Sequence, residues 1–309
     1  MKYSVSLSHF LLLTLLAFSS VIYAESNCAQ NNVELQVLGS GGPELGDKRA
    51  SSSYLIWING KASVLIDAGA GSSLNFEKSA AKFEDLQAIV FSHYHVDHSA
   101  AFPAYIKGSF FTSRDIDLPV YGPEGNTLMP STTEFVQRTF GNEGSFAYLS
   151  NYINQEQASS YHIQSHNVLI KSHQIQYYQL SDNISLSAVA VHHGPLPALA
   201  WRIDVFDCSI TFSGDMNNQF KTLAKLAKDT DLLVMHNAVP ESATGIAANL
   251  HMKPSEIGKI AHNANAKAII ISHRMLRTLG RESQTKHYIE QNYHGSIKFA
   301  NDMDIFTIP

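Results

Sequence analysis

The stretch 92–98 constrains this chain more than any other segment. Within six consecutive residues it holds four possible metal ligands, His93, His95, Asp97 and His98. It directly follows the apolar run Leu86–Phe91, whose length predicts a buried strand. The ligands are therefore expected on a loop at a strand's end, where a rigid scaffold can position them. Imidazole and carboxylate together suit zinc or another first-row metal, so we interpret this stretch as a metal site rather than a histidine-rich surface loop.

Further ligands must come from distant loops, because one short motif cannot surround two ions. Three other predicted strand ends carry suitable side chains: His193, Asp215 and His273. We prefer His193 to its neighbour His192 because it adjoins Gly194. Asp215 could offer one carboxylate oxygen to each of two ions. Taken singly, each of these residues could be a helix cap or a buried core histidine, but strand-end ligands recurring along one chain favour a common site.

The order of the predicted elements favours an α/β fold. Apolar and alternating runs predict strands at 33–40, 53–59, 62–67, 86–91, 173–180, 184–191, 199–205, 209–212, 231–236, 268–272, 297–300 and 305–308. Helices are expected at 74–82, 132–140, 217–228, 254–263 and 283–292. Runs of strands followed by alternating helices and strands occur in both halves, which predicts an αββα four-layer sandwich. We expect a single domain over 25–309, with an insert at about 108–172 that is a candidate lid or substrate arm.

Residues 1–24 have the pattern of a signal peptide. Lys2 is their only charged residue, Phe10–Phe18 is apolar, and Ala24 is a small residue before a cut at Glu25. The apolar run is short for a membrane span, so we expect cleavage, no stable membrane span afterwards, and a periplasmic or secreted protein. In an exported protein Cys28 and Cys208 could form a disulfide, but two separate thiols fit the sequence equally well.

The charge balance bears on the partners. The formal net charge is −5 at pH 7, and the 309 residues contain no basic run. A nucleic-acid partner normally requires a basic surface, so we expect nucleic acid to be unlikely and a small-molecule ester to be the substrate. An oligomer is possible on this sequence.

The candidate ligands, with Asp67-Ala68-Gly69 upstream, resemble those of the metallo-β-lactamase fold hydrolases from Val33 to about Phe306. The resemblance implies a centre with two Zn²⁺ ions, for which Mn²⁺ or Fe could substitute. By that resemblance His93, His95 and His193 hold one ion, Asp97, His98 and His273 hold the other, and Asp215 bridges them. Asp67 would orient the histidine loop, or serve as a buried structural carboxylate.

Two segments resemble one branch of that superfamily, which contains ribonuclease Z, arylsulfatases and cyclic-nucleotide phosphodiesterases. They are the run from His193 through Arg202 and the run Asn249–Ser255. In ribonuclease Z a histidine at the place of His251 assists phosphodiester cleavage, so His251 is a candidate proton donor, with a histidine at a helix start as the alternative. The chain departs from the branch at Asn237, where a glutamate is usual, and that puts the ribonuclease proton relay in doubt.

The function that follows is hydrolysis of a phosphodiester or sulfate ester by a metal-bridging hydroxide, with Asp97 and His251 as catalytic side chains. A lactone, thioester or β-lactam hydrolase would share the same ligands and is the main alternative. A β-lactamase proper fits less well, because those enzymes generally lack a carboxylate at the place of Asp215. A metal-binding protein without turnover is the third hypothesis.

Overall fold

The computed structural model describes residues 1, 3, 28 and 32–308. The predicted signal peptide therefore lies almost entirely outside the described residues, and its proposed cleavage site lies wholly outside them. Among the residues that are described, no helix is long and apolar enough to cross a membrane.

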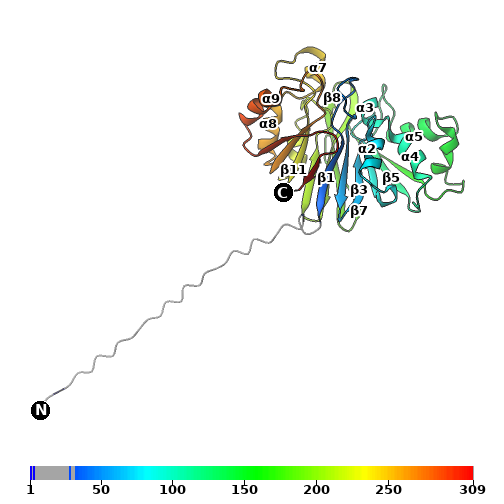
Figure 1. Cartoon of the computed structure of the whole chain (residues 1–309), viewed down its shortest axis with the longest axis horizontal. Coiled ribbons are helices and arrows are strands. Elements are labelled where there is room, and N and C mark those ends of the chain that lie inside the picture. The colour runs from blue at the N-terminus through cyan, green and yellow to red at the C-terminus, as the bar shows by residue number, and fades with distance from the viewer. Residues whose placement is uncertain (2, 4–27, 29–31, 309) are drawn as a thin grey trace.

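Two seven-stranded sheets form the centre of the molecule (Figure 1). The first has the order β14-β1-β2-β3-β4-β5-β6 and the second β13-β12-β11-β10-β9-β8-β7. The strands of the first sheet are β1 (Val33–Gly39), β2 (Ser53–Ile58), β3 (Lys61–Ile66), β4 (Ala88–Val90), β5 (Leu118–Pro123), β6 (Ile163–Val168) and β14 (Ile305–Thr307). Those of the second are β7 (Gln176–Ser181), β8 (Ile184–His193), β9 (Leu196–Val205), β10 (Cys208–Phe212), β11 (Leu232–His236), β12 (Ala268–Ser272) and β13 (Ser296–Phe299).

Helices cover the outer faces of both sheets, as Figure 1 shows for α2, α4 and α5 on one side and α8 and α9 on the other. The helices are α2 (Ser72–Lys78), α3 (Val96–Ser99), α4 (Phe102–Ser109), α5 (Thr132–Phe140), α6 (Leu223–Leu226), α7 (Gly245–Leu250), α8 (Pro254–Asn263) and α9 (Glu282–Glu290), with 3₁₀ turns η1 (Phe83–Asp85) and η2 (Ala147–Tyr152). Apolar side chains from the two sheets meet in one buried cluster, and each sheet shares a second cluster with its own helices. The predicted α/β four-layer sandwich is confirmed.

Cys28 and Cys208 form a disulfide, with their Cα atoms 5.4 Å apart. Both residues are buried in the cluster between the sheets. The bond joins Cys28 to the first residue of β10. Of the two alternatives that fit the sequence, a disulfide or two separate thiols, the structure has the disulfide.

Two predictions about elements differ from the structure. The expected helix over 217–228 is reduced to α6, because Asn218 and Lys221 take left-handed backbone conformations with φ of 65° and 54°, which a helix cannot contain. The stretch 108–172 supplies β5 and β6, two strands that we did not predict. Pro119 in β5 weakened that signal, since proline is rare inside a sheet.

Candidate metal centre

The candidate ligands meet because each follows a strand. The histidine loop follows β4, His193 is the last residue of β8, and Asp215 and His273 follow β10 and β12. β10 and β12 run parallel on either side of β11, so their carboxyl ends lie at one edge of the second sheet. The structure therefore brings residues from both sheets to one edge of the sandwich.

One group consists of His93, His95, His193 and Asp215, whose ligand atoms all lie within 4.8 Å of one another. His193 Nε2 lies 3.4 Å from His95 Nδ1 and 3.8 Å from Asp215 Oδ2. His95 is partly exposed and the other three side chains are buried. The structure places His193 in this group, whereas the ring of His192 turns aside to the Asn217 amide oxygen at 3.0 Å.

A second group of ligand atoms within 4.8 Å of one another consists of His98, Asp215, His236 and His273, and Asp97 lies beside it. His273 Nε2 lies 3.2 Å from Asp97 Oδ2 and 3.4 Å from Asp215 Oδ1. His98 Nε2 lies 3.5 Å from Asp97 Oδ2 and 3.7 Å from Asp215 Oδ2. Oδ2 of Asp215 thus lies near both groups and Oδ1 near the second alone, so the carboxylate is placed where it could bridge two ions.

A metal ion would fit this cluster, because two of its buried ring nitrogens lack a hydrogen-bond partner among the described residues. The Nε2 atoms of His93 and His98 are buried and have no hydrogen-bond partner among the described residues. Their Nδ1 atoms are already engaged, His93 at 3.0 Å from Ser92 Oγ and His98 at 2.7 Å from Asp67 Oδ2. A buried, unpaired nitrogen is costly, and a cation between the rings would remove that cost. Burial also holds the pKa of His93 well below its usual value, so its ring is neutral, as metal binding requires.

Asp67 positions the histidine loop. One carboxylate oxygen accepts the backbone N–H of Ser92 at 2.7 Å, while the other lies near His98 Nδ1 and the Ser92 hydroxyl. Asp67 itself has a left-handed backbone, with φ of 54°. Gly69 lets the loop approach closely, because a Cβ there would lie 2.3 Å from the carbonyl oxygen of Asp97. These contacts fit the role of an orienting residue.

His236 belongs to the cluster, although the sequence analysis did not propose it as a site residue. Its Nδ1 lies 2.8 Å from Asp215 Oδ1 and its Nε2 lies 3.0 Å from the Tyr54 hydroxyl. Burial lowers the pKa of His236 to about 4, so the ring is neutral. The pKa of Asp215 is well below its usual value, since burial, which alone would raise it, is outweighed by neighbouring histidines. The ring therefore donates Nδ1–H to Asp215, while its Nε2 lies against the Tyr54 hydroxyl, which itself donates to Ser272 Oγ at 2.9 Å. The sequence did hold a signal for His236: it lies at the end of a predicted strand, which is also how His273 was identified.

His251 also reaches the cluster, directly after α7. Its Nδ1 lies 3.7 Å from Asp215 Oδ2 and has no hydrogen-bond partner among the described residues. Burial, with smaller contributions from the nearby His273 and His193, lowers the pKa of this imidazole to about 3 against the raising effect of Asp215. Asn237, where the resembling branch carries a glutamate, donates to the carbonyl of Val239 and does not contact the His251 ring. Position 237 therefore offers no carboxylate that could pass a proton to or from His251.

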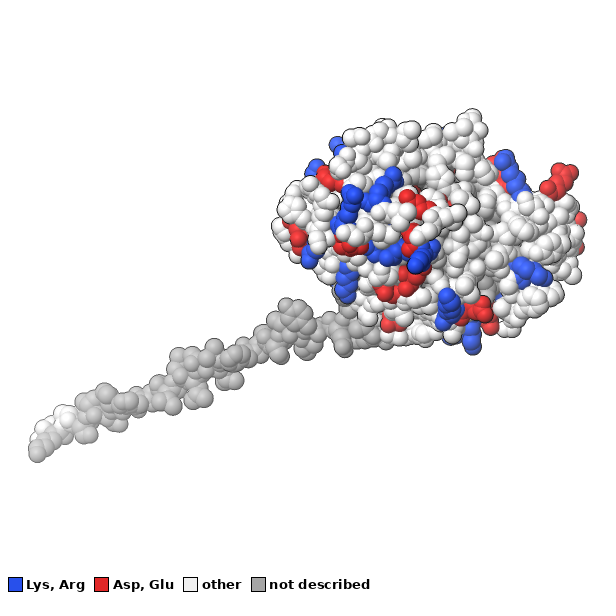
Figure 2. Space-filling model, turned by 45° about the horizontal axis from the view of Figure 1, so that its top comes forward, with Lys and Arg blue, Asp and Glu red and all other residues white. Residues whose placement is uncertain are grey.

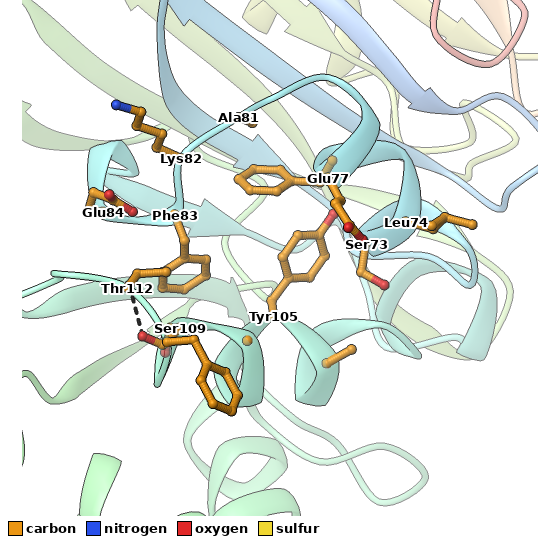
Figure 3. A pocket seen from close by; sticks show the side chains of 14 residues that line it. Ser73, Leu74, Glu77, Ala81, Lys82, Phe83, Glu84, Tyr105, Ser109 and Thr112 are labelled. Carbon is orange, nitrogen blue, oxygen red and sulfur yellow. Dashed lines mark hydrogen bonds between the residues drawn. The ribbon is translucent and has the colours of Figure 1, made fainter.

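The molecule also has a cavity away from this cluster. It measures about 810 Å³ and is lined by residues of α2, η1 and α4, among them Phe83 and Tyr105 (Figure 3). No member of the histidine and aspartate cluster lines it. On the face drawn in Figure 2, basic and acidic side chains are interspersed and form no continuous basic band.

Two packed sheets with a histidine and aspartate cluster at their edge define a metal-dependent hydrolase of the metallo-β-lactamase fold. The chain belongs to the β-lactamase superfamily, because the family model described as "Beta-lactamase superfamily domain" matches residues 62–274. The predicted resemblance and the predicted metal-dependent hydrolase are both confirmed.

Individual relatives are distant but match nearly the full chain. Ribonuclease Z of Streptococcus pyogenes is 23% identical over 306 residues, which cover 88% of this chain and 99% of that protein. The crystal structure of human tRNase Z, short form, has a TM-score of 0.68 at 18% identity and covers 89% of this chain and 99% of its own. Zn²⁺-bound PqqB from Methylobacterium extorquens has a TM-score of 0.63 at 10% identity, covering 88% and 99%.

One prediction is wrong in the light of these relatives. We expected nucleic acid to be an unlikely partner, yet the Streptococcus pyogenes relative is named ribonuclease Z and the human structure is named tRNase Z. The net charge of −5 is a sum over the whole chain and does not give the electrostatic potential at the edge of the sandwich where the cluster lies. Metal ions are often the largest charges in such a site, and the sequence's charge balance omits them.

Proposed function

We propose that this chain is a dinuclear metal-dependent phosphodiesterase. The observation that carries the proposal is the Asp215 carboxylate, whose Oδ2 lies near His193 of the first ligand group and His98 of the second, while Oδ1 lies near His273. His93, His95 and His193 would hold one ion, and Asp97, His98 and His273 the other, with zinc as the expected metal. When bound, two such ions supply a water nucleophile at neutral pH and neutralise charge on the phosphate.

The protein's own side chains have distinct tasks in this proposal. His236 and Tyr54 hold the Asp215 carboxylate in one rotamer, and Asp67 fixes the histidine loop. His251 stands beside the cluster, where it can give a proton to the leaving oxygen. Its ring is neutral in the described geometry, but a substrate phosphate beside it would add negative charge and so favour the protonated ring.

The names of the relatives support phosphodiesters as the substrate class. The curated relatives are ribonucleases Z, so RNA is among the substrates that we propose to test. Sulfate esters, lactones and β-lactams are alternative substrates to be tested beside them, because the same set of metal ligands could support their hydrolysis.

The test is turnover of matched substrates by one zinc-loaded preparation. We expect hydrolysis of bis-p-nitrophenyl phosphate and of a short RNA, and loss of both after chelation. Asp215→Ala should abolish turnover and His192→Ala should leave it nearly intact. Hydrolysis of p-nitrophenyl sulfate or nitrocefin alone would reassign the substrate class.

A second experiment addresses His251. His251→Ala should slow an alkyl phosphodiester by roughly 100- to 10,000-fold, the usual range for general acid catalysis. It should spare p-nitrophenyl esters, whose leaving group needs no proton. Equal loss with both esters, together with loss of an ion, would instead make His251 a ligand.

We also propose that the protein is exported, after cleavage near Glu25. The disulfide between Cys28 and Cys208 supports this proposal, because such bonds persist in oxidising compartments and are rare in the cytosol. Mass spectrometry of the protein from its exporting host would show an N-terminus near Glu25, and retention of Met1 or Lys2 would reverse the proposal.

A further inference from the structure

Arg277 lies beside the second ligand group without being part of it. Its Nε donates to the carbonyl oxygen of Ala238 at 2.5 Å, and its Nη2 lies 3.2 Å from the Met275 sulfur. Ala238 follows His236 by two residues, and Met275 follows His273 by two. The guanidinium is therefore held between the segments that follow two members of the cluster.

The position of Met275 places this charge close to the metal centre. A Cβ built on Gly42 would lie 2.9 Å from His273 Cε1 and 3.3 Å from Met275 Cγ, so that ring and that side chain border the same space.

Arg277 lacks a counter-charge. Among the described residues it forms no ion pair, in contrast to Arg274, which pairs with Glu282. The neighbouring residue at 237 is a neutral asparagine. Arg277 is half-buried, and a partly desolvated guanidinium with unused N–H donors is a ready partner for an anion.

We propose that Arg277 binds a non-bridging oxygen of the substrate phosphate. The N–H groups of the guanidinium that Ala238 and Met275 leave unused can donate to such an oxygen, on the side of the second ligand group. Arg277 is thus a specificity-determining residue that favours anionic phosphodiesters over neutral esters. This proposal rests on the proposed function, because it assumes that a phosphate occupies the metal centre.

The experiment compares Arg277→Gln, Arg277→Lys and the control Arg281→Gln in zinc-loaded protein. Arg281 is exposed and precedes α9, so its replacement makes the same change of net charge away from the cluster. Binding of inorganic phosphate is measured by calorimetry, KM and kcat with bis-p-nitrophenyl phosphate, and zinc by elemental analysis. Loss of one charge-assisted contact should weaken phosphate binding and raise KM by roughly 10- to 100-fold in Arg277→Gln.

Phosphate affinity should fall strongly in Arg277→Gln, less in Arg277→Lys and not at all in Arg281→Gln. The zinc content should be unchanged in all three variants. Unchanged phosphate binding in Arg277→Gln would overturn the proposal. So would loss of zinc in that variant, which would make Arg277 structural, or an equal loss in Arg281→Gln, which would reflect only net charge. If the parent protein cleaves no phosphodiester, the proposed function fails, while phosphate binding still decides the role of Arg277.

Discussion

Each oxygen of the Asp215 carboxylate has its own neighbours. Oδ1 lies near His236 and His273, whereas Oδ2 lies near His98, His193 and His251. A rotation of this one carboxylate would disturb both ligand groups at once. The residue that limits such a rotation is His236, because its hydrogen bond to Oδ1 is the shortest of these contacts.

Replacing His236 by Phe should therefore weaken metal binding while keeping a buried ring. Loss of a partner that orients a ligand typically costs 10- to 100-fold in metal affinity, so we expect a drop of about that size in chelator competition. Tyr54→Phe should cause a smaller drop, because it removes the hydroxyl's contacts with the His236 ring and with Ser272 but leaves the hydrogen bond between His236 and Asp215 in place. His262→Phe on the exposed side of α8 is the control. Unchanged zinc affinity in His236→Phe would mean that Asp215 is held by other contacts.

The metal affinity should also depend on pH through His98. Burial alone would lower the pKa of His98, but the carboxylates of Asp97, Asp67 and Asp215 raise it well above its usual value. Without metal the ring is thus protonated at neutral pH, and binding of an ion at Nε2 must release that proton. Zinc affinity should rise with pH, by up to about tenfold per unit below that pKa. Calorimetry in buffers of different ionisation enthalpy would detect the released proton, and a flat affinity from pH 6 to 8 would contradict the assignment.

At the scale of elements, the strand ends were predictable because each ligand follows a short apolar run. The runs before Ser92, Asp215 and His273 are buried strands, and the polar residues that follow them can be recognised in the sequence alone. The contacts of His236 were not predictable in this way. They join β2 to β11 through Tyr54, and no local pattern reports which residues meet across two sheets. The shortened helix at α6 has a similar cause. The side chain of Asn217 hydrogen-bonds to His192 in β8 and to the carbonyl of Asn249 in α7, both far away in the sequence.

The tight turn between β8 and β9 offers a test at this scale. Gly194 there has a φ of 60°, and a Cβ on it would lie 2.7 Å from the Leu250 side chain. The carbonyl of Leu250 accepts from His193 Nδ1 at 2.9 Å, so displacement of Leu250 would tilt a proposed ligand. Gly194→Ala should lower turnover by roughly tenfold, as for other residues that orient metal ligands.

Gly60→Ala is the matched control for this variant. Gly60 also lies in a hairpin turn with a positive φ of 74°, but nothing lies within 4 Å of a Cβ built there. Both variants should lower the free energy of unfolding by about 1–2 kcal/mol through backbone strain. Only Gly194→Ala should also lose turnover. Equal turnover in the two variants would show that the Leu250 contact does not position His193.

At the scale of the whole molecule, the proposed centre and the disulfide connect different parts of the same sandwich. The metal cluster joins loops of the first sheet to strand ends of the second. The disulfide joins Cys28 to the start of β10, whereas Asp215 follows the end of that strand. At about 3.3 Å per residue, a five-residue strand separates the two ends by roughly 16 Å. The bond should therefore affect stability and leave the chemistry of the site unchanged.

The variant with both cysteines replaced by serine tests this separation. A disulfide that closes a long loop stabilises a protein by typically 2–4 kcal/mol, largely by restricting the unfolded chain, and here the two cysteines lie 180 positions apart. Denaturant unfolding should show a loss of that size, while zinc content and turnover at 25 °C stay near those of the parent. Reduction of the parent protein should lower its stability in the same way, whereas reductant should not affect the variant. If the variant kept its stability but lost zinc, the Cys28 to Cys208 bond would instead act on the site, by fixing the strand that leads to Asp215.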